Sequence, residues 1–153
     1  MHNEGFAMSD LLNGRPSLSF WIIGGAALIW NLFGLIVYVM QVGASPEELA
    51  AEFTAEQVEF MMSTPKWATS AFAIAVSAGV LGSLFLLLRK AWAVPMFVIS
   101  LVAVLIQNLN SFVLNDVIAL FGTTPAIIQA AIVIVGVLLI WYSRGAKDKG
   151  WIS

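Results

Sequence analysis

The chain contains no cysteine, and its only histidine is His2. The missing thiols exclude disulfides, thiol nucleophiles, cysteine-ligated metals and covalent haem attachment. A haem or zinc site built on histidines inside a membrane is excluded as well, because His2 stands at the very end of the chain. The sequence therefore predicts neither a metal nor a cofactor.

Charged residues are scarce too. They make up 10% of the chain, against about 25% in a soluble globular domain. Hydrophobic residues make up 60%, which leaves too little polar surface to cover a soluble fold and indicates a membrane protein. The formal net charge of −2 provides no basic field, so we expect no nucleic acid among the partners.

Recognisable catalytic patterns are also missing. The serines in and near the apolar runs have no histidine to activate them, and no serine–lysine pair has a sensible membrane depth. No phosphate loop, zincin pattern or dinucleotide fingerprint occurs. We therefore predict that the protein is not an enzyme.

What the chain does contain is four long apolar runs. Each is close to the roughly 20 residues that a helix needs to cross about 30 Å of hydrocarbon. Only Arg89 and Lys90 separate the second run from the third, which predicts a tight helical hairpin. The sequence thus predicts an all-α, polytopic membrane protein with a single domain over 1–153. Its expected transmembrane helices span residues 18–42, 67–88, 91–114 and 125–142.

The basic residues predict the orientation. Lys66 alone lies in the connection between the first two runs, beside five glutamates. By the positive-inside rule, the N-terminal segment 1–17 and the tail 143–153 are expected in the cytoplasm, and the acidic segment 43–66 outside. The other six Lys and Arg residues all fall on the expected cytoplasmic side: Arg15, Arg89, Lys90, Arg144, Lys147 and Lys149.

The acidic segment carries two helix-start signals. Ser45 with Glu48 is a capping box, and Thr54 with Gln57 is a second one. The segment is therefore expected to form one broken helix or two short ones, amphipathic and lying on the outer leaflet. A solvated acidic face is the plain interpretation, and contact with a cation or a basic partner is the alternative. Four glutamates would share that face in a continuous helix: Glu48, Glu52, Glu56 and Glu59.

Small side chains form stripes on the first two spans. Without a hydrophobic drive between helices in lipid, small residues allow the close packing that membrane helices need. We expect the two stripes to face each other or a shared centre. The first stripe is Gly24, Ala27, Asn31, Gly34 and Tyr38, and the second is Ala68, Ala71, Ala75, Ala78, Gly79 and Gly82.

Uncharged polar residues gather near the end of the third run. At helical spacing they fall within about 100° of arc, with Asn110 just beside them. Hydrogen bonding between helices, worth about 0.6 kcal/mol per bond on average, is one interpretation. An outward-facing polar pocket is the other, whereas Asp116 is expected at the interface in a solvated or capping role. The candidate ligand-binding residues are Asn31, Gln107, Asn108, Asn110, Ser111 and Asn115.

Three segments carry a resemblance: IWNLFG with Tyr38 downstream, TPKWATSAFAIAVSAGVLGSLFLLLRKAWAVP followed by ISLVAVLIQ, and LLIWYSRGAKDKGWI. They cover most of the chain, which resembles small four-helix inner-membrane proteins of Gram-negative bacteria. Members are often labelled sugar transporters or hypothetical proteins. The resemblance implies location in the bacterial inner membrane and a four-span topology with both termini cytoplasmic, and it assigns no site residue.

Two functions remain open from the sequence. The first is non-enzymatic binding or transport of a small neutral solute, because amides and aromatic rings recognise uncharged ligands. Four helices are too few to enclose a transport path, so a transporter is expected to be a homo-oligomer or larger assembly. The alternative is an accessory or scaffolding subunit of a larger membrane complex, held through the small-residue faces and contacting its partner through the acidic segment.

Overall fold

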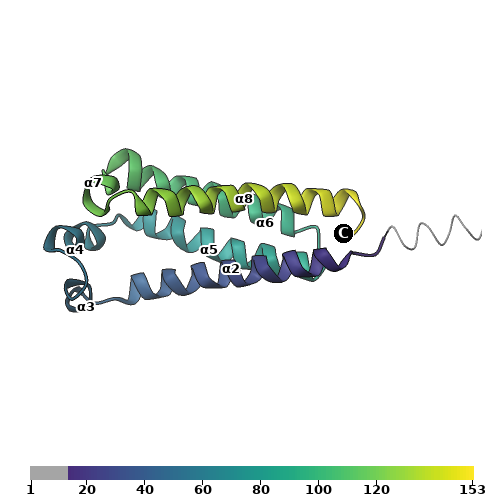
Figure 1. Cartoon of the computed structure of the whole chain (residues 1–153), viewed down its shortest axis with the longest axis horizontal. Helices are drawn as coiled ribbons and strands as arrows, with labels where there is room; N and C mark the ends of the chain where they lie inside the picture. Colours follow the sequence, from purple (N-terminus) through teal and green to yellow (C-terminus); the bar gives the residue numbers. More distant parts are fainter. Residues whose placement is uncertain (1–13) are drawn as a thin grey trace, which may run out of the picture.

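The computed structural model describes residues 14–153, so most of the predicted cytoplasmic N-terminal segment lies outside the described residues. Four helices are long and apolar enough to span a membrane: α2 (Leu18–Gly43), α5 (Lys66–Leu87), α6 continued by η1 (Ala93–Leu114), and α8 (Thr124–Asp148). Three short helices join them at one end of the bundle (Figure 1): α3 (Pro46–Ala50), α4 (Ala55–Met62) and α7 (Val117–Phe121). The predicted all-α class with four spans is confirmed.

The four long helices do not pack equally on one another. α5 packs against α6, α2 packs against α5, and α8 packs against α6, whereas no comparable packing joins α2 to α8 within residues 14–153. Figure 1 shows α2 and α8 at opposite edges of the bundle, with α5 and α6 between and behind them. The central helices α5 and α6 therefore provide the main packing surfaces for the outer helices α2 and α8.

The small-residue stripe of α2 faces α5 along most of its length. A Cβ on Gly24 would lie 2.7 Å from Leu87, and one on Gly34 would lie 3.6 Å from Val76. Further along, the rings of Tyr38 and Phe72 meet edge to face with centroids 5.2 Å apart. The opposite row remains 56–71% exposed, as lipid-facing residues should be: Ile22, Ile29, Phe33, Ile36 and Met40.

The small residues of α5 serve two neighbours at once. Gly79 lies under the side chains of Asn31 from α2 and Ser100 from α6. A Cβ on Gly82 would lie 2.8 Å from the ring of Phe97 on α6, and Ala75 is buried among α6 residues. The small-residue stripe of α2 therefore faces α5, and the small residues of α5 contact both α2 and α6.

The turn between α5 and α6 is as tight as the sequence predicts. The Lys90 N–H donates to Phe85 O (2.7 Å) and the Arg89 N–H to Leu86 O (3.0 Å), which is the Schellman way of ending a helix. Glycine usually occupies the left-handed position of this motif, yet here it is Arg89, at φ 59°. Its guanidinium donates to Trp151 O (2.8 Å) and Gly14 O (3.1 Å), which holds the turn in place.

The C-terminal residues fold back onto this turn. Helix α8 continues past the predicted membrane boundary at Tyr142 and ends in a second Schellman motif at Gly150 (φ 70°). The Ser153 N–H then donates to Arg89 O and the Ala91 N–H donates to Ser153 O, both at 3.0 Å. Ile152 is 2% exposed and enters the core beside Phe20 and Leu86. We call residues 150–153 the C-terminal latch.

At the opposite end both predicted capping boxes form. Ser45 caps α3 and Thr54 caps α4, with the reciprocal bonds from Glu48 and Gln57 present. Hydrogen bonds from the backbone N–H and hydroxyl of Ser45 hold the pKa of Glu48 below its usual range. The box around α3 is therefore intact at neutral pH and weakens as the pH falls through that lowered pKa.

The acidic segment is two helices and not a continuous one, so Glu48, Glu52, Glu56 and Glu59 do not share a single helical face. The apolar side of this segment was expected to lie on the outer leaflet, but part of it packs on α7 instead. The rings of Phe53 and Phe60 contact Phe121 of α7, and Gln57 Nε2 donates to Leu120 O at 2.7 Å. The expected capping role of Asp116 is confirmed, because its carboxylate accepts from the Ala119 N–H at 3.0 Å.

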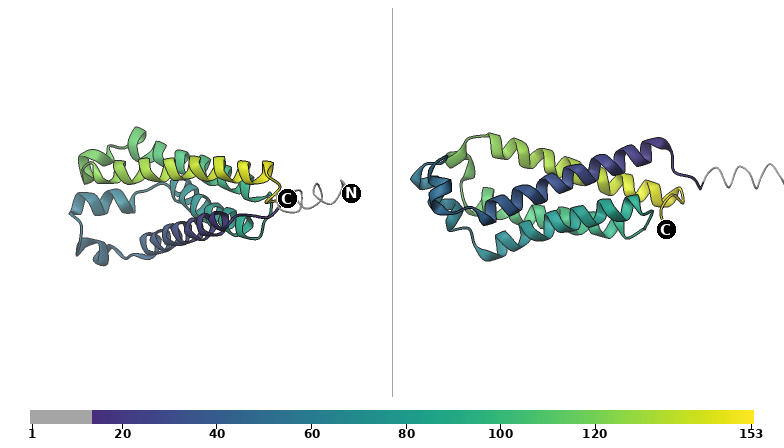
Figure 2. Two further views of the ribbon diagram at one scale, coloured as in Figure 1. Left: turned by 45° about the vertical axis from the view of Figure 1, so that its right-hand side comes forward. Right: turned by 90° about the horizontal axis from the view of Figure 1, so that it is seen from below.

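The charges separate along the bundle. Six of the seven basic residues lie at one end of the bundle. This end contains the start of α2 and the turn at Arg89, which is hydrogen-bonded to the C-terminal residue Ser153. The short helices with Lys66 and the five neighbouring glutamates form the other (Figure 1 and Figure 2). An even number of spans places both described ends of the chain on the same side.

The latch generates the first prediction. Ile152→Ala should lower the free energy of unfolding by about 2–5 kcal/mol, because it removes a fully buried aliphatic side chain where three chain segments meet. Thermal unfolding of the purified protein in mild detergent measures the loss. Ile134→Ala on the exposed face of α8 is the matched control and should cost far less. Equal losses in the two variants would contradict a structural role for the latch.

Candidate functional site

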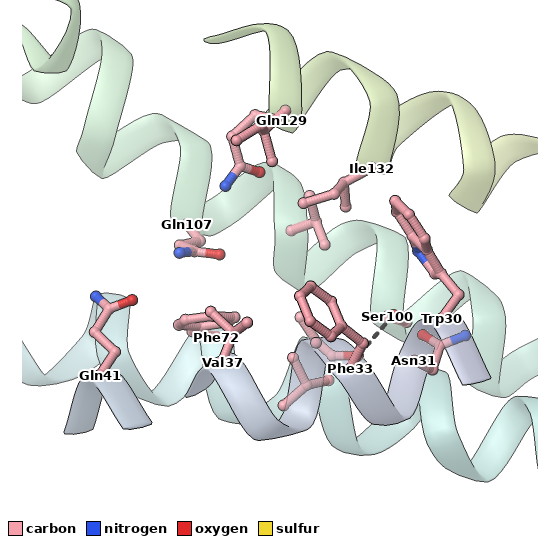
Figure 3. A pocket seen from close by; sticks show the side chains of 15 residues that line it. Trp30, Asn31, Phe33, Val37, Gln41, Phe72, Ser100, Gln107, Gln129 and Ile132 are labelled. Atoms are coloured by element: carbon pink, nitrogen blue, oxygen red, sulfur yellow. Dashed lines mark hydrogen bonds between the residues drawn. The ribbon is translucent and has the colours of Figure 1, made fainter. Parts of the chain in front are cut away.

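A recess lies between α2 and α8, with α5 and α6 as its floor (Figure 3). Its volume is about 260 Å³. It exists because the small residues of α5 bring α2 close to α5, while α8 packs mainly on α6 among the spanning helices. All four spanning helices line it: Trp30, Asn31, Phe33, Gly34, Val37 and Gln41 from α2; Phe72, Ala75 and Val76 from α5; Ser100, Val104 and Gln107 from α6; and Ile128, Gln129 and Ile132 from α8.

Three glutamines line the half of the recess nearer the short helices. Gln41, Gln107 and Gln129 come from three different helices. Figure 3 shows the amides of Gln107 and Gln129 in the same part of the recess, with Gln41 toward its end. The side-chain oxygen of Gln129 is buried and has no hydrogen-bond partner. This half of the recess therefore offers amide groups whose hydrogen-bonding capacity is not used up by the protein.

A smaller cavity of about 60 Å³ shares Gln41, Phe72 and Gln107 with the recess. Its remaining lining comes from α4, the start of α5, and η1 (Leu109–Leu114). Because Thr64, Thr69, Asn110 and Ser111 are among those residues, hydroxyl and amide groups continue toward the end of the bundle that carries the acidic segment.

The other half of the recess is apolar in effect. Asn31 lies there, but its Nδ2 donates to Ala27 O (2.9 Å) and to Ser83 Oγ (3.1 Å). The Ser100 hydroxyl likewise donates to Ala75 O at 2.7 Å. The donor groups of Asn31 and Ser100 are therefore used in helix packing, and the surface beside them is formed mainly by Trp30, Val76 and Ile132. For Asn31 the geometry supports the interpretation of a bond between helices.

The remaining candidates of the third span do not share one stripe. Asn108 lines a shallow groove against α8 that shares only Gln129 with the recess, and the side-chain oxygen of Asn108 is buried and unpartnered. Asn110 is 3% exposed, and Asn115 Nδ2 donates to Asn110 O (2.8 Å) and Oδ1 (3.4 Å). Asn108 is the last residue of α6, and beyond it η1 is a π-helix, whose wider turns move Asn110 and Asn115 away from the α-helical spacing that predicts the stripe.

Several lining residues are absent from the candidates that the sequence identifies. Gln129 is the only amide in the run 125–142, and an amide inside hydrocarbon needs a partner, so this signal could have found it. Phe72 and Trp30 carry no such signal, because periodicity cannot tell which apolar face borders a gap. For Gln41, the position in the chain predicts only that the residue lies near the outside.

The acidic candidates do not converge. Glu48, Glu52, Glu56 and Glu59 are all exposed, and Glu48 is engaged in the cap of α3. Among residues 14–153 no group of three acidic or histidine side chains is arranged to hold a metal ion. The arrangement of the glutamates leaves contact with a protein partner as an untested prediction.

The chemistry that the recess offers is hydrogen bonding and aromatic contact without charge. Its polar lining consists of amides and one hydroxyl, and Asp, Glu, Lys and Arg are absent from the lining residues. No protein-family model, curated protein or solved structure matches the chain. The resemblance to small inner-membrane proteins therefore stays a prediction, and the recess is the feature that bears on function.

The packing beneath the recess generates the second prediction. Gly79→Ala should destabilise the protein by about 1–3 kcal/mol, because the added methyl group would overlap the side chain of Asn31. The cost should shrink when Asn31→Ala is present, since the overlapping atoms are then gone. Unfolding in detergent of the two single variants and the double variant measures this coupling.

Gly25→Ala is the matched control, because a Cβ at that glycine meets no atom within 4 Å. It should leave stability unchanged or slightly raised. An equal cost of Gly79→Ala with and without the Asn31 side chain would show that this contact does not limit the approach of α2 to α5.

Proposed function

We propose that the recess binds a small, neutral, hydroxyl-bearing solute. The observation that supports this most directly is the presence of Gln41, Gln107 and Gln129, from three helices, around one cavity. An unsatisfied amide in a membrane interior costs on the order of several kcal/mol, so these groups need water or a ligand as a partner. A hydroxyl suits them because it both donates and accepts a hydrogen bond.

The lining also favours an uncharged ligand. A charged solute brought to this depth would need a counter-charge, and the lining residues include none. Aromatic rings at Trp30, Phe33 and Phe72 provide apolar contact area beside the amides. With about 260 Å³, the recess lies just below the range of about 300–1,000 Å³ typical of ligand pockets, so the part of a ligand that it encloses is small.

The alternative of an accessory subunit held through its small-residue faces loses its main support. Those faces are already occupied, because the stripe of α2 packs on α5, and α5 packs in turn on α6. A larger complex would have to use other surfaces, such as the acidic segment. Solute binding is therefore the function that the geometry supports better.

Location and assembly belong to the same proposal. The end with six basic residues would face the cytoplasm of a bacterial inner membrane, which opens the glutamine half of the recess toward the outside. Transport, beyond binding, would need more than one copy of the chain, because the recess is bordered by only four helices and does not form an enclosed path.

The binding proposal generates the third prediction. Neutral polyols and sugars such as glycerol and glucose should raise the melting temperature of the purified protein, because a ligand that binds only the folded state stabilises it. Charged analogues such as gluconate and glucosamine should not. Gln107→Leu should abolish the shift, since it removes an amide shared by the recess and the smaller cavity.

Asn108→Leu is the control on the neighbouring residue, which lines the groove against α8 and not the recess. It should keep the shift caused by the neutral solute. If both variants respond to glycerol and glucose as the unmodified protein does, the recess is not the binding site for these solutes.

The orientation generates the fourth prediction. The chain has no cysteine, so one introduced thiol reports on one position only. Glu56→Cys should react with a membrane-impermeant maleimide added to intact spheroplasts, and Lys147→Cys should react only after permeabilisation. The reverse pattern would place the basic end outside and turn the recess toward the cytoplasm.

A further inference from the structure

We infer that the ligand of the recess is a membrane-borne amphipath, with an uncharged hydroxyl headgroup and one acyl chain, that enters sideways from the outer leaflet. This inference depends on the recess being a binding site, as proposed above. It names the class of ligand and the route by which it arrives. Three independent features of the recess support it: where the mouth lies, how polarity changes along the cavity, and how long the cavity is.

The mouth of the recess lies on the side of the bundle. Trp30 and Phe33 on α2 are exposed although they line the recess, and so is Ile128 on α8. These three apolar side chains belong to the segments that cross the membrane. Because α2 and α8 pack much less closely on each other than on α5 and α6, the space between them at the recess opens toward acyl chains. A ligand dissolved in the bilayer can enter without passing through water.

Polarity changes along the recess in one direction. The free amides of Gln107 and Gln129 lie in the half nearer the short helices, and the smaller cavity extends this polar region toward Thr64 and Ser111. The other half is apolar, because Asn31 and Ser100 are bonded to neighbouring helices. A wholly polar solute would match only one half. A molecule with a polar head and an apolar tail matches both.

The unpartnered side-chain oxygen of Gln129 indicates the chemistry of the ligand headgroup. The buried side-chain oxygen of Gln129 has no donor within the described part of the chain. When the Gln129 side chain turns this oxygen toward the recess, a glycerol-type hydroxyl provides that donor and can also accept from a neighbouring amide. A phosphate headgroup would introduce negative charge where the lining has no basic residue. The head is therefore an uncharged polyol and not a phospholipid phosphate.

The length of the recess agrees with one leaflet. Trp30 and Gln41 mark its extent along α2, and a helix rises about 1.5 Å per residue, so the recess runs for about 16 Å. The hydrocarbon of one leaflet is about half of 30 Å. The recess encloses about 260 Å³, so it would hold the headgroup and part of the acyl chain, with the rest of the chain outside the mouth among the bilayer lipids. The ligand would keep the depth and direction that it has in the bilayer, with its head at the level of the short helices.

Photolabelling tests this inference on the full-length protein in phosphatidylcholine nanodiscs. The probe is a monoacylglycerol with a diazirine in its acyl chain. We expect labelling of peptides that line the recess, and we expect unlabelled monoolein, but not glycerol, to suppress it. Ile128→Trp should reduce labelling about tenfold, because the larger side chain fills the mouth through which the acyl chain enters. A tenfold reduction corresponds to about 1.4 kcal/mol of binding free energy.

Ile127→Trp is the matched control. The two neighbouring isoleucines of α8 are 67% and 52% exposed, and only Ile128 lines the recess. Labelling that is equal in the two variants, or that excess monoolein does not suppress, would indicate contact with bulk lipid and would overturn the inference. Competition on the unmodified protein gives this answer even if a tryptophan variant fails to fold.

Binding of the water-soluble probes separates this inference from the proposed function. Glycerol or glucose binding that depends on Gln107, without competable labelling by the monoacylglycerol, would leave the recess as a solute site and refute the amphipath. Absence of both kinds of binding would refute both statements. Competable labelling that Gln107→Leu weakens would support both.

Discussion

The close approach of α5 to two neighbours determines the shape of this bundle. Lipid provides no hydrophobic drive between helices, so backbones come together only where side chains are small. Gly79 lies under Asn31 of α2 and beside Ser100 of α6, and Gly82 lies against Phe97 of α6. Because α5 takes both contacts, α2 and α8 pack much less closely on each other, and the recess is the space left between them.

The polar side chains inside the bundle divide into two groups by how they are satisfied. Asn31, Ser83 and Ser100 bond to neighbouring helices or to their own backbone, and they hold the packed half of the molecule together. Gln107 and Gln129 border open space instead. Since a membrane interior penalises an unsatisfied amide, the second group explains why the recess needs an occupant, whether water or ligand. Polar side chains of this bundle therefore hold helices together in one part of it and border the recess in another.

Local rules that act within a few residues predicted the structure well. The capping boxes at Ser45 and Thr54 form, and the exposed row on α2 follows the expected helical spacing. The predictions were weaker where geometry depends on distant segments. Gln129 became a lining residue through the position of α8 on α6, which no periodicity encodes. Beyond Asn108 the expected stripe was lost, because a π-helix replaced the α-helix that the spacing assumed.

The wider turns of η1 also allow the third span to lose a residue with less disturbance than the other spans would suffer. Removing one residue from a regular spanning helix rotates everything beyond the deletion by about 100°, which would turn lipid-facing side chains inward. Within Leu109–Leu114 the surplus length of a π-helix can absorb such a loss by tightening into ordinary α-helical turns. Deletions of one residue in related sequences should therefore accumulate in this short stretch. Each would change the direction of the nearby amide side chains, while the rest of the bundle keeps its register.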